Sequence, residues 1–270
     1  MSILDNIKKA HLDQYLLRCQ TVMPELNVEE ARKVALAAIR YYKGSKAARE
    51  ELRARQDLEK RWYESVASGT PDFGVYDDDY FIAEMWACWV VYSRGYVRTL
   101  SKIIKTFGNL DVIADLGNGF GYTTAALKEL WTGTYVYGTN LRETRQYRIA
   151  EALGKLYDYN MFPSVSGPID LVVAFEYFEH FEQPIEHLAM ILDTSNPKFL
   201  VTANAFGSTS IGHFPKYKLT RLEISADSQL DVTVSNKAIG RHFNKYLRYR
   251  GYEPVKTGFW NNRPAVWRRK

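Results

Sequence analysis

A glycine-rich turn between an apolar strand and a helix constrains the fold of this chain more than any other feature. The run Asp115-Leu-Gly-Asn-Gly-Phe-Gly121 follows an apolar stretch at 111–115 and precedes a helical stretch at 123–130. Glycines let the backbone turn sharply and approach a ligand closely, and the first turn of a helix offers free N–H groups. The turn therefore predicts a parallel α/β sheet with a nucleotide-like ligand at its edge.

The chain after this turn alternates strands with helices. Further strands are expected at 135–138, 155–159, 169–175 and 199–203, with helices at 142–153 and up to 191. Such alternation indicates a parallel sheet with both faces covered. A helix at 237–250 precedes two strands, 253–260 and 265–268, which Asn261-Asn262 joins into an antiparallel hairpin.

The chain before the turn has a different texture. Residues 1–106 predict a helical extension ahead of a domain over 107–270. Asn27 can cap one helix, and Ser45 can cap a second that runs to about residue 67. A long apolar helix is expected from about Tyr80 to the end of the extension.

The glycine spacing distinguishes two classes of cofactor. The dinucleotide pattern G-x-G-x-x-G would need glycine at position 122, where Tyr122 stands. The pattern D-x-G-x-G-x-G instead resembles motif I of class I S-adenosylmethionine-dependent methyltransferases. Three further stretches are similar to that family in the same order: 158–163, 169–181 with its Glu179-His180 pair, and 199–203.

This resemblance implies a Rossmann-like class I methyltransferase fold, with a mostly parallel seven-stranded sheet closed by an antiparallel C-terminal hairpin and preceded by the helical extension. It implies an enzyme that uses S-adenosylmethionine and releases S-adenosylhomocysteine. The implied cofactor contacts are Asp115, Gly117, Asn118, Gly119, Gly121, Asn140, Leu141, Asp158, Tyr159 and Phe175. Asn140 departs from the family, which places there an acid that accepts both ribose hydroxyls with charge-assisted hydrogen bonds.

Two side chains are candidates for the general base of methyl transfer. Glu176 follows the expected strand 169–175, where open α/β sheets place their ligands. His213 follows the last parallel strand and has the ordinary pKa range of a general base. Each also has a structural explanation, as a loop acid and a surface histidine. His180 is expected to pack or cap rather than react, and no spacing of residues predicts a metal site.

An aromatic and acidic loop at 76–80 precedes the long apolar helix. The resemblance implies that this segment folds over the cofactor as a lid. A helix start enriched in Asp, which favours the helix dipole, is the preferred explanation of the loop.

The acceptor class stays open between two kinds of molecule. The insert at 205–235 and the helical extension can enclose a small or nucleotide-like acceptor. Residues 236–270, with ten Lys or Arg against one acid, can instead follow the phosphates of a nucleic acid. A protein with this fold that binds without catalysis is a further alternative, while Tyr122 and Asn140 disfavour a dinucleotide oxidoreductase.

The sequence contains no signal for a membrane or a secreted protein. No apolar run approaches the roughly 18 residues of a membrane span, and the first residues lack a signal-peptide pattern. The only cysteines, Cys19 and Cys88, do not form a disulfide framework. We expect a cytoplasmic protein, and nothing in the sequence indicates an oligomeric state.

Overall fold

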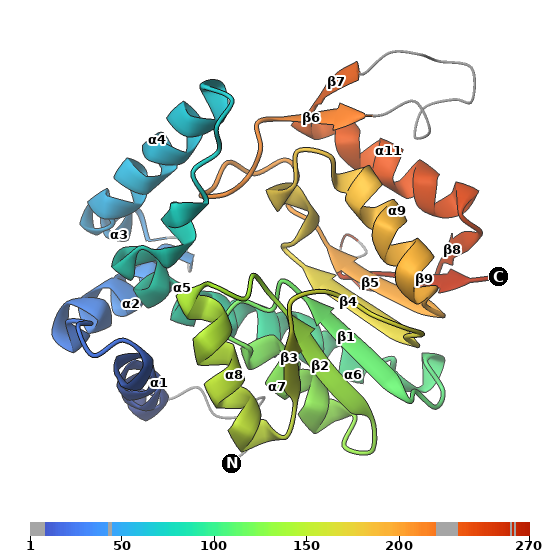
Figure 1. The fold of residues 1–270 in the computed structure, drawn as a ribbon, viewed down its shortest axis with the longest axis horizontal. Coiled ribbons are helices and arrows are strands. Elements are labelled where there is room, and N and C mark those ends of the chain that lie inside the picture. Colours follow the sequence, from blue (N-terminus) through green and yellow to red (C-terminus); the bar gives the residue numbers. More distant parts are fainter. Residues whose placement is uncertain (1–8, 43–44, 220–231, 260, 262) are drawn as a thin grey trace.

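A mixed sheet of seven strands forms the centre of the protein in this computed structural model, which describes residues 9–42, 45–219, 232–259, 261 and 263–270 (Figure 1). The strands are β1 (Val112–Leu116), β2 (Tyr135–Thr139), β3 (Asn160–Phe162), β4 (Leu171–Phe175), β5 (Phe199–Ala203), β8 (Tyr252–Pro254) and β9 (Ala265–Arg269). Their order is β3-β2-β1-β4-β5-β9-β8. The first five are parallel, and β9 pairs antiparallel with both β5 and β8. The sheet confirms the Rossmann-like class I methyltransferase fold.

Helices cover both faces of this sheet because each buried strand is apolar on both sides. On one face, Ile113 and Val173 share a core with α7 (Tyr122–Leu130) and α8 (Arg145–Tyr157). On the other face, Ala114 and Val172 share a core with α9 (Pro184–Ser195) and α11 (Asn236–Tyr249). Successive strand residues alternate between the two cores, as the period of a β-strand requires.

The region before β1 is helical, as predicted. It contains α1 (Lys9–Val22), α2 (Val28–Tyr42), α3 (Lys46–Glu51), α4 (Arg53–Ala67), η1 (Phe73–Asp77), α5 (Asp79–Val91), a π-helical turn η2 (Tyr92–Val97), α6 (Arg98–Ser101) and η3 (Ile104–Thr106). Asn27 Oδ1 accepts from Glu30 N at 3.2 Å, and Ser45 Oγ accepts from Ala48 N at 3.4 Å, so both predicted caps are confirmed. Leu12 and Leu16 of α1 pack in the same core as the sheet residues of that face.

Several local predictions differ from the structure. The strand expected at 253–260 is shorter, because β8 ends at Pro254, and the long helix expected from Tyr80 is divided into α5, η2, α6 and η3. The helix expected at 46–67 is interrupted at Leu52, whose ψ of 43° lies outside the helical region. The strand expected at 155–159 is wrong, because α8 continues to Tyr157 and Asp158 ends it in the left-handed conformation. The insert contains a separate antiparallel pair, β6 (Lys216–Leu219) and β7 (Val232–Ser235), that the sequence did not predict.

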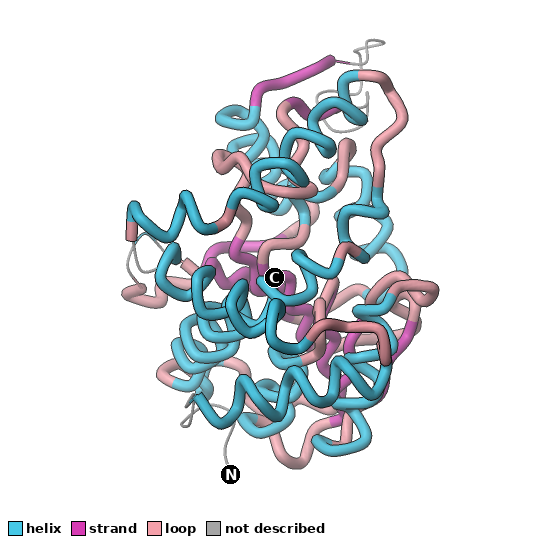
Figure 2. Tube along the Cα trace, turned by 90° about the vertical axis from the view of Figure 1, so that its left-hand side faces the viewer, coloured by secondary structure: helices cyan, strands magenta, loops and turns pink. Residues whose placement is uncertain are grey.

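The helical region reaches over the edge of the sheet where the parallel strands end, here called the carboxyl edge. We call residues 46–80 the cap. Asp77 of the cap accepts from Arg145 N, which follows β2, and Tyr76 Oη lies 2.7 Å from His180 Nδ1, which follows β4. Figure 1 shows the N-terminal helices on the left of the sheet, and Figure 2 shows this side, with helices in front of the strands.

The cap also contacts the insert that follows β5. Trp62 Nε1 donates to the His213 carbonyl at 2.8 Å, and Tyr63 Oη donates to the Ser210 carbonyl at 3.2 Å. Arg55 Nη2 donates to Ser210 Oγ at 2.8 Å. The cap is therefore joined to the connections that follow β2, β4 and β5, and it roofs the carboxyl edge.

Candidate functional site

The glycine-rich turn lies at the carboxyl edge, between β1 and α7. Gly117, Gly119 and Gly121 have φ angles of 58°, 55° and 86°, a conformation that side chains with a Cβ rarely adopt. The turn is tied to β2 by a hydrogen bond from Asn118 N to the Thr139 carbonyl at 3.1 Å. The three glycines are thus required by the backbone itself, which brings the first turn of α7 up to the edge.

Gly117 and Gly119 differ in what surrounds them. A Cβ on Gly117 would lie 2.3 Å from the ring of Tyr177, which packs directly on this side of the turn. A Cβ on Gly119 would meet, among the described residues, the flexible end of Met85 at 3.1 Å. The turn is therefore covered at its first glycine and more accessible at its second.

Behind the turn, a chain of hydrogen bonds links Asn118 and Thr124 to the buried Asp115. Asn118 Nδ2 donates to Thr124 Oγ1, and Thr124 Oγ1 donates to Asp115 Oδ2, each at 2.8 Å. Burial raises the pKa of Asp115 to about 7, and the Thr124 hydrogen bond opposes this shift. Asn118 Oδ1 is buried without a hydrogen-bond partner, which leaves one acceptor for a donor from outside the described chain.

Asn140 braces the turn rather than standing free at the end of β2. Its Nδ2 donates to the Gly119 carbonyl at 3.1 Å, and its Oδ1 accepts from Leu141 N at 2.8 Å. A carboxylate at this position could not donate to that carbonyl. The amide thus has a structural reason to replace the expected acid, while the side chain of Leu141 is 59% exposed.

Glu176 lies directly after β4, beside the turn, in a cluster of polar side chains. Its backbone has a φ of 49°, and its N–H donates to the Ala203 carbonyl at the end of β5. Tyr96 Oη donates to Glu176 Oε1 at 3.1 Å, and Arg263 Nη2 forms an ion pair with the same oxygen. The ring of Phe175, a predicted cofactor contact, lies 5.0 Å from the Tyr96 ring in this cluster.

Glu176 also forms a carboxyl pair with Glu179. The two carboxyls interact electrostatically, and Glu179 is fully buried with its Oε1 accepting from Ala205 N at 2.8 Å and its Oε2 without a hydrogen-bond partner. Burial raises the pKa of both carboxyls, most strongly at Glu179, and Arg263 opposes the shift at Glu176. Two neighbouring carboxyls favour one proton between them, and of the two Glu179 favours the protonated form more strongly.

The histidines form a second layer behind this pair. His180 contacts the Glu176 backbone, and its ring lies 4.9 Å from that of His213. Burial lowers the pKa of His180 to about 3 and that of His213 to about 4. His213 Nδ1 donates to the Ser208 carbonyl at 3.0 Å, so the neutral ring carries its proton there and Nε2 is the basic atom. The structure places His213 in the insert, where its carbonyl accepts from Trp62 of the cap.

Asp158 and Tyr159 are not brought together with the other predicted residues. Asp158 ends α8 at the opposite edge of the sheet, where its side chain is 93% exposed and pairs with Lys128 at 3.1 Å. Tyr159 is buried between α7 and α8, and its hydroxyl donates to the Ala150 carbonyl at 2.7 Å. Because β3 begins five residues later than expected, its carboxyl end is formed by Phe162.

Sequence reasoning missed the role of Tyr96, Tyr177 and Arg263. These three side chains come from η2, the loop after β4 and the loop before β9, far apart in the sequence. Arg263 was noted only as one charge of a basic C-terminal stretch. A signal existed for Tyr177 alone, since it lies in the stretch 169–181 that resembles the family.

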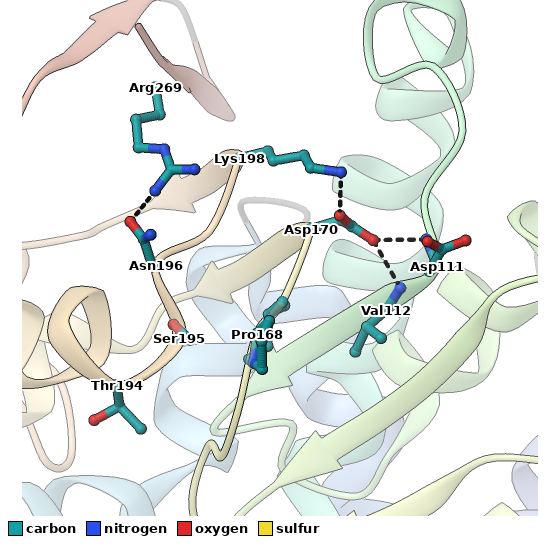
Figure 3. Close-up of a pocket in the computed structure, with 10 residues that line it drawn as sticks. Asp111, Val112, Pro168, Asp170, Thr194, Ser195, Asn196, Lys198 and Arg269 are labelled. Carbon is teal, nitrogen blue, oxygen red and sulfur yellow. Dashed lines mark hydrogen bonds and ion pairs between the residues drawn. The ribbon is translucent and has the colours of Figure 1, made fainter.

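A hollow of about 380 Å³ lies at the other edge of the sheet, where the parallel strands begin (Figure 3). Asp170 dominates it and accepts from Asp111 N at 2.6 Å, Val112 N at 3.0 Å and Lys198 Nζ at 2.7 Å. These contacts fix the start of β1 against β4. The hollow is therefore explained by strand pairing.

The described residues offer neither a cluster suited to a metal ion nor a helix suited to a membrane. No group of three or more His, Cys, Asp or Glu side chains there is placed to hold a metal ion. Within the same residues, no helix has the length and apolar character needed to span a membrane.

Comparisons with known proteins return distant structural neighbours. No family model and no curated protein matches the sequence. A protein provisionally described as an O-methyltransferase, from Nostoc punctiforme, is 11% identical with a TM-score of 0.48, over 73% of this chain and 60% of that protein. The sugar N-methyltransferase KedS8 from Streptoalloteichus is 13% identical with a TM-score of 0.45, over 66% of this chain and 88% of that protein.

A third neighbour is the N-terminal domain of EvdMO1 with S-adenosylhomocysteine bound. It is 14% identical with a TM-score of 0.42, over 73% of this chain and 82% of that domain. The chain thus spans 60% of the length of the Nostoc protein and more of the other two. Identities this low carry no statement about the activity of this chain.

Proposed function

We propose that this protein is an S-adenosylmethionine-dependent methyltransferase that acts on an oxygen or nitrogen atom of a small, sugar or nucleotide-like acceptor. The observation that supports it most is the glycine turn at 117–121, placed at the carboxyl edge where Glu176 also follows its strand. Open α/β sheets bind ligands at this edge. The proposed division of the chain, a helical lid over 1–106 and a cofactor domain over 107–270, agrees with the cap contacts.

The residues of the turn fit the proposed cofactor. The accessible side of Gly119 and the first turn of α7 offer backbone N–H groups, and Asn118 Oδ1 is a buried acceptor that lacks a partner. Asn140 Oδ1 retains one lone pair beside its bond to Leu141 for a ribose hydroxyl. When bound, S-adenosylmethionine supplies an electrophilic methyl group.

Glu176 is the residue best placed to take the proton of the acceptor. It directly follows β4, and its Oε1 is held by Tyr96 and Arg263, which fix its position. Methyl transfer needs little more from a protein than alignment, proton removal and exclusion of water. His213 is the second candidate. Its ring is neutral, its Nε2 carries no proton and can accept one, and it lies in the insert where the insert contacts the cap.

The roof favours an enclosed acceptor over a polymer. The cap and the insert are joined through Trp62, Tyr63 and Arg55. Two segments from different parts of the chain, the cap and the insert, therefore meet over the carboxyl edge. A small molecule can be surrounded by such a roof, whereas a nucleic acid needs an open groove.

Calorimetric titration with S-adenosylhomocysteine tests the cofactor site, using Gly119→Ala beside the parent. Alanine at φ 55° strains the turn, and within the described part of the chain its methyl group would meet only the flexible end of Met85, which has to shift slightly. Gly108→Ala is the matched control, because Gly108 has a φ of 63° with open space around it and lies before β1, away from the site. We expect micromolar binding in the parent and control, and at least tenfold weaker binding in Gly119→Ala.

Two outcomes would contradict the proposal. A folded parent that does not bind S-adenosylhomocysteine would favour a protein that keeps the fold without the chemistry. Equal binding in Gly119→Ala and Gly108→Ala would place the cofactor elsewhere. Binding that weakens steeply with salt for an oligonucleotide, together with normal cofactor binding, would instead favour a nucleic-acid acceptor.

A further inference from the structure

Arg263 links the solvent to the buried carboxyl pair. It lies in the loop between β8 and β9, and its guanidinium reaches Glu176 and the Ala203 carbonyl, the latter at 3.3 Å. The same group lies over the Tyr96 ring, 5.7 Å from its centre. The Arg263 side chain is 40% exposed while that of Glu176 is 14% exposed. The cation therefore faces outward as well as toward the pair.

The charges around Glu176 balance only while Arg263 is present. Glu179 holds the shared proton, so the carboxyl pair has a single negative charge, and burial keeps His180 and His213 neutral. Arg55, which influences His213, is itself paired with Glu59 and Glu84. Tyr96 is neutral because burial raises its pKa. Arg263 is thus the counter-ion of Glu176 among the described residues.

The Arg263 guanidinium can bind an anion in addition to its present partners. The hydrogen bonds to Glu176 and to the Ala203 carbonyl both come from one nitrogen, Nη2. Arginine has five N–H donors in a planar fork, which matches carboxylate and phosphate groups with two parallel bonds. An incoming anion would compete with Glu176 for this cation.

We propose that Arg263 binds an anionic group of the methyl acceptor, a carboxylate or a phosphate, and that this binding frees Glu176 to take the acceptor's proton. The inference rests on the proposed function, because it names the class of acceptor for the same site. In the transfer, the acceptor's O–H or N–H proton goes to the Glu176 carboxylate. The electron pair of that O–H or N–H bond stays on the acceptor atom and forms the new bond to the methyl carbon, while the sulfur–carbon bond breaks and its electron pair stays on sulfur.

The test measures binding of inorganic phosphate and of acetate by calorimetry at constant ionic strength. Arg263→Gln should abolish binding, and Arg263→Lys should weaken it, because lysine keeps the charge and loses the fork. Glu176→Gln should tighten binding about tenfold, because the competing carboxylate is gone. The phosphate and acetate arms distinguish the two kinds of anionic acceptor.

Arg268→Gln and Glu253→Gln are the matched controls. These residues form an exposed ion pair across the same hairpin. Arg268→Gln changes the net charge as Arg263→Gln does, and Glu253→Gln changes it as Glu176→Gln does, but neither control alters the site. Unchanged anion binding in both controls, with the three expected effects, supports the proposal. Anion binding that is absent in the parent, or unaffected by Arg263→Gln, overturns it.

A titration with S-adenosylhomocysteine in the same samples separates the two proposals. Normal cofactor binding without anion binding sinks the role of Arg263 alone. Anion binding at Arg263 without cofactor binding contradicts the proposed function. Circular dichroism and thermal unfolding confirm that each variant folds, and Arg263→Lys keeps the test valid if Arg263→Gln does not.

Discussion

Burial disfavours the charged form of Asp115, and among the described residues no cation pairs with it. Thr124 donates a single neutral hydrogen bond to its Oδ2. A carboxyl in such surroundings favours its protonated form, and its pKa rises to about 7. The start of the glycine turn therefore titrates close to neutral pH.

Replacing Asp115 with Asn should make the stability of the protein less sensitive to pH. The ordinary pKa is 3.8, so between about pH 4 and pH 7 the folded state binds more protons than the unfolded state. The free energy of unfolding of the parent then falls as pH rises. We expect Asp115→Asn to gain up to about 4 kcal/mol relative to the parent across this window, measured by urea denaturation at each pH.

The comparison with the parent isolates this carboxyl from the other titrating groups. His180 and His213 act in the opposite direction, because their pKa values are lowered and their neutral forms stabilise the fold as pH rises. Their contribution is common to both proteins and cancels in the difference. A difference that does not change between pH 4 and pH 7 would contradict the prediction.

Residues that act through local backbone geometry could be predicted from the sequence, and those that meet across the fold could not. The glycines at 117, 119 and 121 carry their own reason, since only glycine adopts these φ angles easily. Glu176 was found because it ends an apolar strand. Arg263 reaches it from 87 positions away, and the sequence contains nothing that pairs them.

At the scale of elements, strands and helices followed the sequence wherever apolar periodicity alone decided them. The stretch 199–203 forms β5 as expected, because it is apolar throughout and buried on both faces. β3 was displaced because the left-handed cap at Asp158 is not marked by glycine. The interruption at Leu52 could not be predicted, since the helix propensity there is good.

The hydrogen bond between the cap and α8 can be tested by substitution. Asp77 Oδ1 accepts from Arg145 N at 3.0 Å and so satisfies an N–H in the first turn of α8. Asp77→Ala should lower the free energy of unfolding by about 1 kcal/mol. It should also speed amide hydrogen exchange in residues 73–80, which mass spectrometry can follow. Asp57→Ala, at an exposed position of α4, is the control.

If Asp77→Ala and Asp57→Ala behave alike, the cap is not held through α8. The lid interpretation of the 76–80 loop would then depend on its other contacts, those of Asp79 with Arg145 and of Tyr76 with Gln146 and His180. If exchange rises only in residues 73–80, the loop acts as a lid that α8 anchors.

At the scale of the whole molecule, the exposed charges of α11 and the candidate site are on different parts of the fold. Arg241 and Lys245 lie on the exposed face of α11, whose apolar face packs with α9 in the second core. The glycine turn lies at the carboxyl edge of β1. Cofactor binding should therefore be independent of the α11 charges.

The double variant Arg241→Ala, Lys245→Ala tests this separation. We expect the affinity of the double variant for S-adenosylhomocysteine to stay within about twofold of that of the parent at both low and severalfold higher salt. Salt screens exposed charges such as those of α11, and these charges lie away from the cofactor site. Calorimetry at two salt concentrations makes the measurement. An affinity that drops in the double variant would show that α11 communicates with the carboxyl edge.

The place of β9 in the sheet has a consequence for how the protein is made. β9 is the last strand along the chain, yet it lies between β5 and β8. Until the ribosome has delivered it, β5 presents a row of unpaired N–H and C=O groups next to Leu200 and Val201, which are fully buried in the finished fold. Such an edge can pair with another chain. The nascent protein thus has its greatest risk of aggregation just before synthesis of β9, and its sheet closes in one late step.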